Sequence, residues 1–395
     1  MDSTALSHVL ASLNNSQRKE LLKDASLVSV YQIFETLPDP RRRQGLRYDL
    51  AYLLTCLAAA MLCNRNSTLA VAEWCRDHQD LLEKQLGPRK FSCPDDSLYR
   101  KLLPRLDACH VEAAIGDWIR ATLVAQPDEP IALDGKKVRG ARTDDEEAPD
   151  LLSFCTHYSQ ETLLQVLVGE KTNEIPVAFA ILPFLPVAGR VYTADALHTH
   201  LPFFQRIQAL HGHTVLIVKG NQPTLKEHLI TYFADPDATF EQACTLDLQK
   251  GRKEIRSIKV TSALNDYLQQ DWPGVAQVAQ LTRTVTTGKT GVTTTEVVYL
   301  ITTLPASQAC PDRLLELVRG HWCIENRSHY VRDVTFEEDR SRLRTGHAPQ
   351  IIAALRNLAI TLIHRHGSSQ IASSRRSLSS HPERACAWLL QPQVT

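Results

Sequence analysis

The sequence predicts an α/β protein: a mixed sheet with flanking helices, interrupted by a β-rich insertion and preceded by a helical N-terminal domain. Three observations support this prediction. Residues 1–125 show helical periodicity, residues 126–235 alternate short apolar runs with helical stretches, and residues 236–305 are rich in threonine and valine. Alternating strands and helices favour a sheet covered by helices, and β-branched residues favour strands.

Charge, cysteine content and hydropathy exclude several classes of protein. Lysine plus arginine equals aspartate plus glutamate at 44 each, so any nucleic-acid-binding surface must be a local cluster of cations. The 10 cysteines include no C-x-x-C pair, which is typical of reduced thiols and not of disulfide frameworks or zinc sites. The longest apolar stretch, 50–63, is shorter than the about 18 residues of a membrane span. Met1 is followed by a polar run, which is not the pattern of a signal peptide. We therefore expect a cytoplasmic protein.

Residues 1–125 are predicted to form short helices joined by tight turns. Asp49 and Ser67 are expected N-caps, Gly87 is expected to end the helix that Ser67 begins, and Ser97 is the expected cap of a third helix. Such helices fit a helix-turn-helix DNA reader, and they fit an ordinary helical bundle equally well.

The pattern changes at "EPIALDGKKVRG", where the apolar run 131–133 leads into Asp134. This run predicts a strand with a carboxylate near its end, and "RVYTADAL" predicts another strand that ends in a carboxylate, Asp195. "LLSFCTHYS", "TLLQVLVGEKT" and "TVLIVKG" predict three further strands. The order of these strands could place Asp134 and Asp195 side by side.

Residues 236–305 are predicted to be a β-rich insertion in this α/β core. "EIRSIKV" and two long runs around the "TGKTG" turn are typical of strands and a hairpin. Helical periodicity then returns, so the core is expected to comprise 126–235 and 306–366. Residues 367–395 are predicted to form a serine-rich linker and a short terminal helix.

A helix expected to begin near Asp312 carries the candidate for a third acid. Residues three or four apart form one stripe, made of Leu314, Val318, Trp322, Glu325, His329 and Arg332. The first half of the stripe is apolar and is expected to face the core, with Trp322 packing to fix the helix. Glu325 continues the stripe, and a carboxylate there must be paired, protonated or bound to a metal. The plainer alternative is an ion pair of Glu325 with Arg332 or a histidine.

The acids that follow Glu325 are expected to have other roles. Glu337, Glu338 and Asp339 are consecutive and precede arginines, which is typical of a solvated, salt-bridged surface. Asp333 could pair with a neighbouring arginine.

Three convergent acids, Asp134, Asp195 and Glu325, would form a hard-oxygen site suited to Mg²⁺ or Mn²⁺. Two such ions about 4 Å apart can activate a water or a 3′-hydroxyl and stabilise the leaving oxygen in phosphodiester cleavage. Single aspartates after strands are common, so the pattern by itself leaves this triad a hypothesis.

Several segments in order carry a more specific signal. They are "DPRRRQGLRYDLAYLL", "IALDGKKVRG", "GEKTNEIP", "VYTADALHTH", "IVKGNQPTLK" and "HWCIENRSHYVRDVTFEEDRSRLR". From about Asp39 to beyond Asn357, the chain resembles the H-repeat-associated family of bacterial insertion-sequence transposases, within the DDE transposase group. The resemblance implies an RNase H-like catalytic core, a helical N-terminal region that helps to hold DNA, and DNA cutting and joining with two Mg²⁺ or Mn²⁺ ions. It places Asp134, Asp195 and Glu325 at the family's three acids.

Around the third acid the chain departs from a signature of related transposases, Tyr-x2-Arg-x3-Glu-x6-Lys. Val318, His321, Glu325 and Arg332 stand at its four positions. Arg332 could still hold a phosphate, bidentately where lysine would act as a point charge. His321 could donate to DNA or orient the carboxylate, and a packed core histidine is the alternative.

Other candidates for DNA contact are cations and amides near the strand ends and the N-terminus. They are Lys136, Lys219, Asn221, Gln222, Arg41, Arg42 and Arg43. A second basic cluster contains Arg340, Arg342 and Arg344. For each of these residues an ordinary polar turn or surface cation is the alternative.

The expected function is DNA transposition: metal-dependent cleavage at the ends of an insertion sequence and strand transfer into target DNA. The expected partners are the terminal inverted repeats, target DNA and further copies of the chain, in the nucleoid of a bacterial cytoplasm. Two alternatives stay open, a catalytically silent DNA-binding remnant of a mobile element and an RNase H-like nuclease that cuts without joining.

Overall fold

The computed structural model describes residues 3–42, 46–87, 93–123, 128–143, 147–169, 174–249, 251–288 and 290–392. Contacts divide the chain into two compact units. The first unit comprises Met1–Pro127, Gly135–Val177 and Ile324–Thr395, and the second comprises Asp128–Asp134 and Ala178–Cys323. The N-terminal and C-terminal segments of the chain therefore belong to one unit, a division that differs from the predicted domains.

The N-terminal part of the first unit contains only helices among its described residues. The α-helices are α1 (Ser3–Leu13), α2 (Ser16–Leu21), α3 (Val30–Glu35), α4 (Leu50–Leu62), α5 (Thr68–Asp77), α6 (Gln79–Leu86), α7 (Asp96–Leu102) and α8 (Ala108–Leu123). Ser67 caps α5 by accepting from the amide of Ala70, as predicted. The predicted single helix is interrupted at His78, so Gly87, with φ of +84°, ends the separate helix α6 and not the helix that Ser67 begins. The predicted cap at Ser97 is wrong, because Asp95 accepts from the amide of Leu98 and begins α7 earlier.

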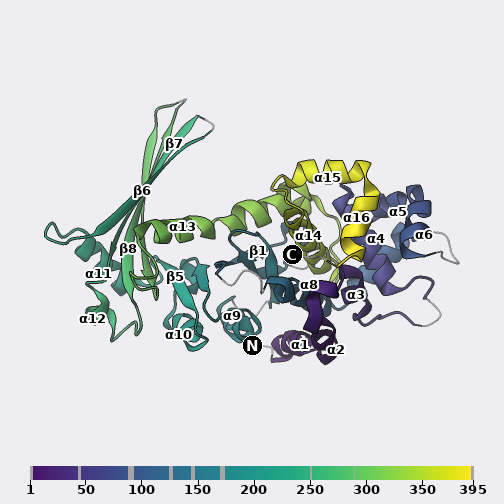
Figure 1. Ribbon diagram of the computed structural model, residues 1–395, viewed down its shortest axis with the longest axis horizontal. Coiled ribbons are helices and arrows are strands. Elements are labelled where there is room, and N and C mark those ends of the chain that lie inside the picture. The colour runs from purple at the N-terminus through teal and green to yellow at the C-terminus, as the bar shows by residue number, and fades with distance from the viewer. Residues whose placement is uncertain are drawn as a thin grey trace. The chain divides into compact units, whose positions relative to one another are not determined.

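Two helices that are buried along most of their length lie at the centre of the first unit. Every residue of α4 is buried, and α14 (Ala348–Arg365) is buried along nearly all of its length. α14 contacts α4 and α8, and Figure 1 shows these helices grouped with α15 (Ile371–Ser380) and α16 (Pro382–Leu390). The prediction of a serine-rich linker is therefore wrong: α15 buries Ile371, Arg375 and Leu378, and its serines occupy the positions between them.

Strands complete the first unit. β2 (Asp150–Thr156) and β3 (Thr162–Val168) pair antiparallel, with Asp150 opposite Val168. The second half of β1 (Ile131–Lys137) also belongs to this unit. α8 and α14 contact β3, so helices cover this part of the sheet.

The second unit holds the first half of β1 and six further strands. They are β4 (Val191–Ala194), β5 (His213–Val218), β6 (Glu241–Gln249), β7 (Arg252–Thr261), β8 (Gln277–Thr287) and β9 (Thr293–Thr302). β1, β4 and β5 pair in parallel, whereas β5 pairs antiparallel with β9 and the hairpin strands pair antiparallel with one another. β6 is a strand that the sequence pattern did not reveal.

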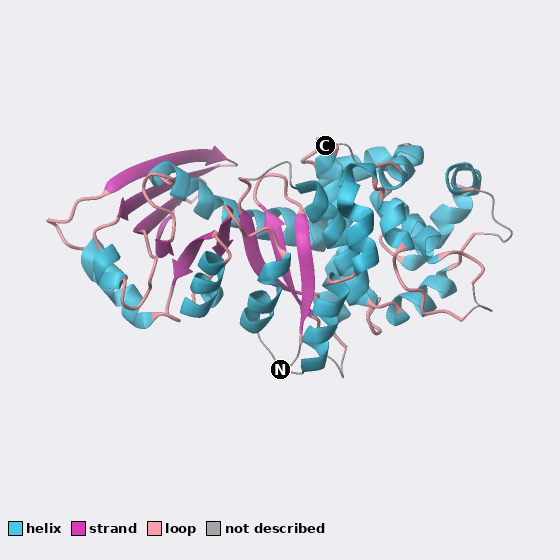
Figure 2. Cartoon of the chain, turned by 60° about the horizontal axis from the view of Figure 1, so that its bottom comes forward, coloured by secondary structure: helices cyan, strands magenta, loops and turns pink. Residues whose placement is uncertain are grey.

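Helices pack on the strands of the second unit, as Figure 2 shows. They are α9 (Glu174–Ile181), α10 (Leu201–Ala209), α11 (Pro223–Phe233), α12 (Asn265–Leu268) and α13 (Pro311–His321), of which α9 begins in the first unit. α13 contacts β4, β5, β6 and β7. Its Leu314, Leu317 and Val318 join an apolar core with Val215 and Leu300, which confirms the apolar first half of the predicted stripe.

The strand order is β3-β2-β1-β4-β5-β9-β8-β7-β6 in one nine-stranded sheet, and β1 is shared by the two units. This mixed sheet with flanking helices and a helical N-terminal region confirms the predicted α/β class, and strands from the 236–305 segment extend the sheet. Among the described residues, no helix is both long enough and apolar enough to cross a membrane.

Candidate active site

Asp134 and Asp195 lie beside each other in the sheet of the second unit. β1 and β4 pair in parallel with Leu133 opposite Ala194, so the two aspartates are the next residues on neighbouring strands. Both side chains are half-buried. The prediction that these acids stand side by side is confirmed, although β1 continues to Lys137 and Asp134 is not at its end.

Asp195 begins a short 3₁₀ helix, Ala196–His198, and its Oδ1 accepts from the amide of Leu197 at 2.9 Å. The loop after β5 holds this turn. The Asn221 amide donates to the carbonyl of Ala196 at 2.5 Å, and the Gln222 amide donates to the carbonyl of Thr199 at 2.9 Å.

Asn221 and Gln222 therefore use their amides within the protein, which argues against the predicted DNA contact by these two side chains. Their contacts position the backbone that follows the second acid. Lys219 is exposed at the start of the same loop, and its contact with DNA stays a prediction.

His321 is a packed core histidine. It is buried at the end of α13, with its Nδ1 3.2 Å from the hydroxyl of Thr193, two residues before Asp195. Burial lowers the pKa of His321 to about 4, although the nearby Asp195 opposes the shift. A neutral, buried ring does not fit the predicted contact with DNA, and it fits a role in fixing α13 against β4.

Two residues near the second half of β1, Glu174 and Lys136, make contacts that the sequence pattern did not predict. A Cβ atom on Gly135 would lie 1.9 Å from Oε1 of Glu174, so the Glu174 carboxylate lies close against the backbone of Gly135. Lys136 is buried, and its Nζ donates to both carboxylate oxygens of Asp333 at 2.7 Å. This ion pair argues against the predicted DNA contact by Lys136, and it answers the open question about Asp333. Glu174 lies within the segment "GEKTNEIP", so that motif was the sequence feature that could have drawn attention to this residue.

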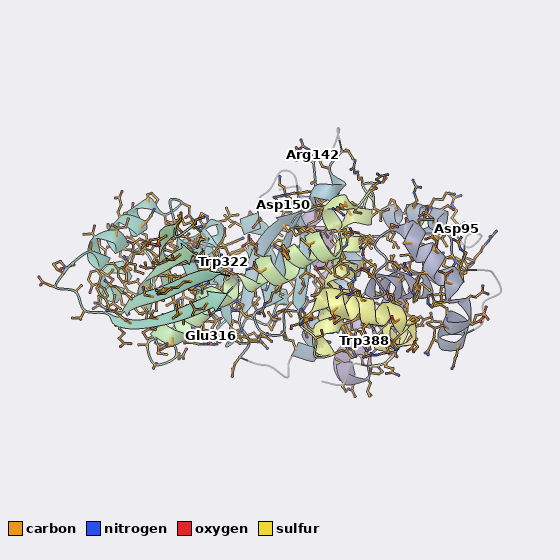
Figure 3. All side chains as sticks on the ribbon, turned by 90° about the horizontal axis from the view of Figure 1, so that it is seen from above. Asp95, Arg142, Asp150, Glu316, Trp322 and Trp388 are labelled. Carbon is orange, nitrogen blue, oxygen red and sulfur yellow. The ribbon has the colours of Figure 1, made fainter. Side chains whose placement is uncertain are left out.

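The segment that carries Glu325 is a π-helix and not a continuation of α13. Ile324–His329 and Val331–Thr335 are π-helical. A π-helix closes i→i+5 hydrogen bonds and takes more residues per turn than an α-helix, so a spacing of three or four residues no longer follows one face. The prediction that Glu325 faces inward is wrong: its side chain is exposed. Trp322, labelled in Figure 3, is 49% exposed and does not pack as predicted.

Arg332 and Glu338 form a buried ion pair in the first unit. Both are 0% exposed, and two guanidinium nitrogens of Arg332 donate to the Glu338 carboxylate at 2.8 and 2.9 Å. Arg356 donates to the same carboxylate at 3.0 Å. Although burial opposes ionisation, the charges of Arg332 and Arg356 lower the pKa of Glu338 to about 2.

These contacts correct two predictions. Arg332 cannot grip a DNA phosphate while it is enclosed and paired, and Glu338 is not a surface acid. The pair continues into a polar network, because Arg332 also donates to Oε1 of Gln165, which accepts from Asn357 as well. The network places paired charges where a helical pattern predicts either surface or apolar core.

The predicted N-terminal cluster divides into three cases. Arg41 is half-buried and forms a salt bridge with Asp39 at 2.6 Å, so its charge is already paired. Arg42 is exposed. Arg43 lies outside the described residues.

The donors at Asp134 and Asp195 fit the predicted metal, since neighbouring carboxylates are the hard oxygen ligands that Mg²⁺ and Mn²⁺ prefer. A different group, His8, Asp107 and Cys109, is the one set of three in the described part of the chain whose ligand atoms lie within 4.8 Å of one another. Hydrogen bonds account for that group: Oδ2 of Asp107 lies 2.6 Å from His8 Nε2 and 2.8 Å from His110 Nδ1.

Comparison with known proteins shows the family of this chain. The family model described as "Transposase DDE domain" matches residues 125–362, and the model described as "DDE_Tnp_1-associated" matches residues 31–119. "Putative transposase YncI" of Escherichia coli O157:H7 is 24% identical over 350 residues, which cover 86% of this chain and 88% of that protein. "H repeat-associated putative transposase YhhI" of Escherichia coli strain K12 is 22% identical over 336 residues, which cover 83% of this chain and 88% of that protein.

The cryo-EM structure of a piggyBac transposase synaptic complex with hairpin DNA aligns with 95% of this chain and 81% of its own, at 12% identity and a TM-score of 0.38. A score this low does not define the fold. The DDE domain match, by contrast, spans more than half of the chain and contains all three predicted acids. The chain therefore belongs to the DDE transposase family. It is a DNA transposase that is similar to the H repeat-associated proteins.

Proposed function

We propose that this chain cuts DNA at the ends of an insertion sequence and joins the freed ends to target DNA, using Asp134, Asp195 and Glu325. The observation that carries the proposal is the strand register, in which Leu133 opposite Ala194 sets the two aspartates side by side. In the first step water attacks a phosphodiester and frees a 3′-hydroxyl. In the second step this hydroxyl attacks a target phosphodiester, forming one P–O bond as another breaks.

The three carboxylates would hold Mg²⁺ or Mn²⁺. Bound ions would lower the pKa of the attacking water or hydroxyl and stabilise charge on the leaving oxygen. Asp134 and Asp195 supply oxygen ligands from the sheet, and Glu325 is assigned as the third ligand on its place in the motif order. Its carboxylate is exposed and is therefore accessible to such an ion.

Neighbouring residues would keep the second acid in place and would not touch the DNA. Asn221 and Gln222 hold the turn after Asp195. The Thr199 hydroxyl donates to the carbonyl of Ile217 at 2.6 Å, which ties the same turn to β5. Such contacts limit the motion of the carboxylate, and a displacement of about 1 Å at a reacting centre can lower a rate roughly a hundredfold.

DNA binding by this chain also belongs to the proposal. Exposed Lys219 and Arg42 are the members of the predicted set that stay available for phosphate contacts. The expected DNA partners are the terminal inverted repeats and the target, and the expected active form is an oligomer assembled on the DNA ends.

The test is a cleavage and strand-transfer assay on linear DNA that carries the candidate ends, with and without Mg²⁺. Asp134→Asn, Asp195→Asn and Glu325→Gln are each expected to abolish both reactions and to leave DNA binding within about twofold of wild type. Asp339→Asn, which removes an exposed acid from the same region, is the matched control and should keep both activities. Metal-dependent cleavage that persists in Glu325→Gln would remove that residue from the site.

The same assay distinguishes the alternatives. Cleavage without strand transfer identifies a nuclease, and DNA binding without cleavage by the wild-type chain identifies a silent remnant. Either outcome overturns the proposed activity while leaving the family assignment intact.

A further inference from the structure

A basic hollow lies within the first unit. Its volume is about 370 Å³, and it is lined by Ser97, Arg100, Lys101, Pro104, Arg342, Leu343, Arg344, Thr345 and Ala348. α7 and the turn after it form one wall, and the segment between Arg342 and the start of α14 forms the other. Asp95, which begins α7, is labelled in Figure 3.

Backbone contacts hold the two walls together. The His347 amide donates to the carbonyl of Pro104 at 3.4 Å. Gly346 has φ of +52°, and a Cβ atom there would lie 2.7 Å from the same carbonyl, so glycine is required for this approach. The Arg344 side chain is held from outside the two walls, because its Nε donates to the carbonyl of Gly140 at 3.0 Å. The hollow is therefore a built feature of the fold and not a chance gap between mobile side chains.

The lining concentrates positive charge in a chain whose net charge is zero. Four of its residues are cationic and none is acidic. Arg100 reaches Asp96 only at 3.7 Å, and the Arg100 side chain is 68% exposed. Within the part of the chain that the structure describes, Lys101 and Arg342 are exposed and make no hydrogen bond or ion pair.

The start of α14 adds to this charge. Ala348 is the first residue of that helix and lines the hollow, and the N-terminal end of a long helix carries partial positive charge that favours anions. Unpaired arginine and lysine side chains around such an end suit phosphate groups, which arginine can bind through two hydrogen bonds.

We infer that this hollow grips the sugar-phosphate backbone of DNA, an inference that rests on the proposed function. It assigns a phosphate-binding role to Arg100, Lys101, Arg342 and Arg344. Arg342 follows Glu325 by 17 positions in the sequence (342 − 325), so one segment of chain carries both a proposed catalytic acid and a wall of the hollow. Because the lining offers cations and almost no base-reading amides, we expect contact with the backbone and little dependence on base sequence.

The experiment measures binding of a fluorescent DNA duplex by the full chain over a range of salt concentrations. In the double variant Lys101→Ala, Arg342→Ala, the slope of log affinity against log salt is expected to fall by roughly 1.8, because each lost phosphate contact removes about 0.9. Affinity at fixed low salt should fall roughly tenfold or more. The double variant Lys101→Arg, Arg342→Lys, which keeps both charges, should retain the wild-type slope.

The matched control is Arg376→Ala, Arg384→Ala, which removes two exposed arginines of the same unit outside the hollow. Equal slopes for this control and the Lys101, Arg342 variant overturn the inference while DNA binding and the proposed function stand. If the wild-type chain binds no DNA, the proposed function fails with it. The last measurement repeats the binding experiment with inorganic phosphate added at constant ionic strength. If phosphate at low millimolar concentration abolishes the difference in DNA affinity between variant and wild type, the hollow is a small-anion site and the DNA assignment is wrong.

Discussion

α13 and the π-helical segment that follows it are consecutive in the sequence but bury opposite kinds of side chain. In the second unit, α13 buries Leu314, Leu317 and Val318 against the strands. In the first unit, Ile324–Thr335 buries Arg332 and His329 together with Ile324 and Ser328, and five of its other residues are exposed. One segment is held by apolar contact and the other by ion pairs.

The difference explains why one half of the stripe was predictable. Leucines three or four apart predict a buried face, because burial is the usual fate of such a stripe. A buried arginine gives no such signal, since charged residues are rarely enclosed unless a partner neutralises them. Glu338, the partner of Arg332, lies beyond the π-helix in a run of acids that is typical of surface.

The largest effect is expected from removing the charge at the centre of the polar network. Glu338→Gln leaves Arg332 and Arg356 buried without their shared counter-ion. Breaking one side of a buried ion pair typically costs about 3–5 kcal/mol, so we expect a loss of this size in the free energy of unfolding, measured in urea. Asp339→Asn, an exposed neighbour, should change the free energy by less than about 0.5 kcal/mol. Equal effects of the two substitutions would contradict the burial of Glu338.

A slightly smaller effect is expected from the apolar half of the comparison. Leu314 is 0% exposed, and Leu314→Ala should leave a cavity in the core of the second unit. Such cavities cost about 2–5 kcal/mol, and we expect about 3 kcal/mol in urea unfolding. The control is Glu316→Ala, two residues away, whose side chain is 52% exposed. A loss below about 1 kcal/mol for Leu314→Ala would show that the core relaxes around the missing side chain.

Each of the two segments also buries a histidine, which predicts a dependence on pH. Burial lowers the pKa of His329 to about 3, with the charges of Arg332 and Lys136 adding to the shift and Glu338 opposing it. A pKa below that of the unfolded chain means that the stability from the neutral ring is complete above about pH 6.5 and is lost as the pH falls. At pH 5.5 the unfolded state gains about 1.4 kcal/mol per such histidine.

The measurement is urea unfolding of wild type and His329→Gln at pH 7.5 and pH 5.5. The loss on acidification should be about 1.4 kcal/mol smaller in the variant. Burial raises the pKa of Glu112 to about 8, so protonation of this residue stabilises the folded protein as the pH falls. Because this effect is present in both proteins, the quantity to compare is the difference between variant and wild type. His321→Gln tests the other segment in the same way, since the pKa of His321 lies at about 4. If variant and wild type respond equally to acid, the ring is charged in the folded protein.

Much of the sheet and the neighbouring positions of Asp134 and Asp195 could be predicted from the sequence. β1, β4 and β5 are short apolar runs bounded by polar residues, and parallel strands bring their carboxyl ends to one edge of a sheet. That geometry makes the pairing of Asp134 with Asp195 an expected result. The spacing of Asn221 and Gln222 revealed a polar turn, but only coordinates show that its amides hold the backbone after Asp195.

The environment of the third acid could not be predicted in the same way. Helical spacing assumes i→i+4 hydrogen bonds, and no residue type marks the change to i→i+5 bonds at Ile324. The burial of Lys136 against Asp333 depends on contacts between segments 197 positions apart, which lie beyond any local pattern.

The smallest effect is expected at the junction of the two segments, where Trp322 ends α13. A tryptophan on the predicted stripe would anchor the helix, and its removal would cost about 3–5 kcal/mol. Because the side chain is 49% exposed, we expect Trp322→Ala to lower the free energy of unfolding by less than about 1 kcal/mol. Trp118→Ala is the buried counterpart, since that ring is 1% exposed and its N–H donates to the carbonyl of Val28 at 2.9 Å. Its loss should reach the full cost of a core tryptophan. Equal losses for the two variants would restore Trp322 to the core and, with it, the inward-facing stripe that the spacing predicts.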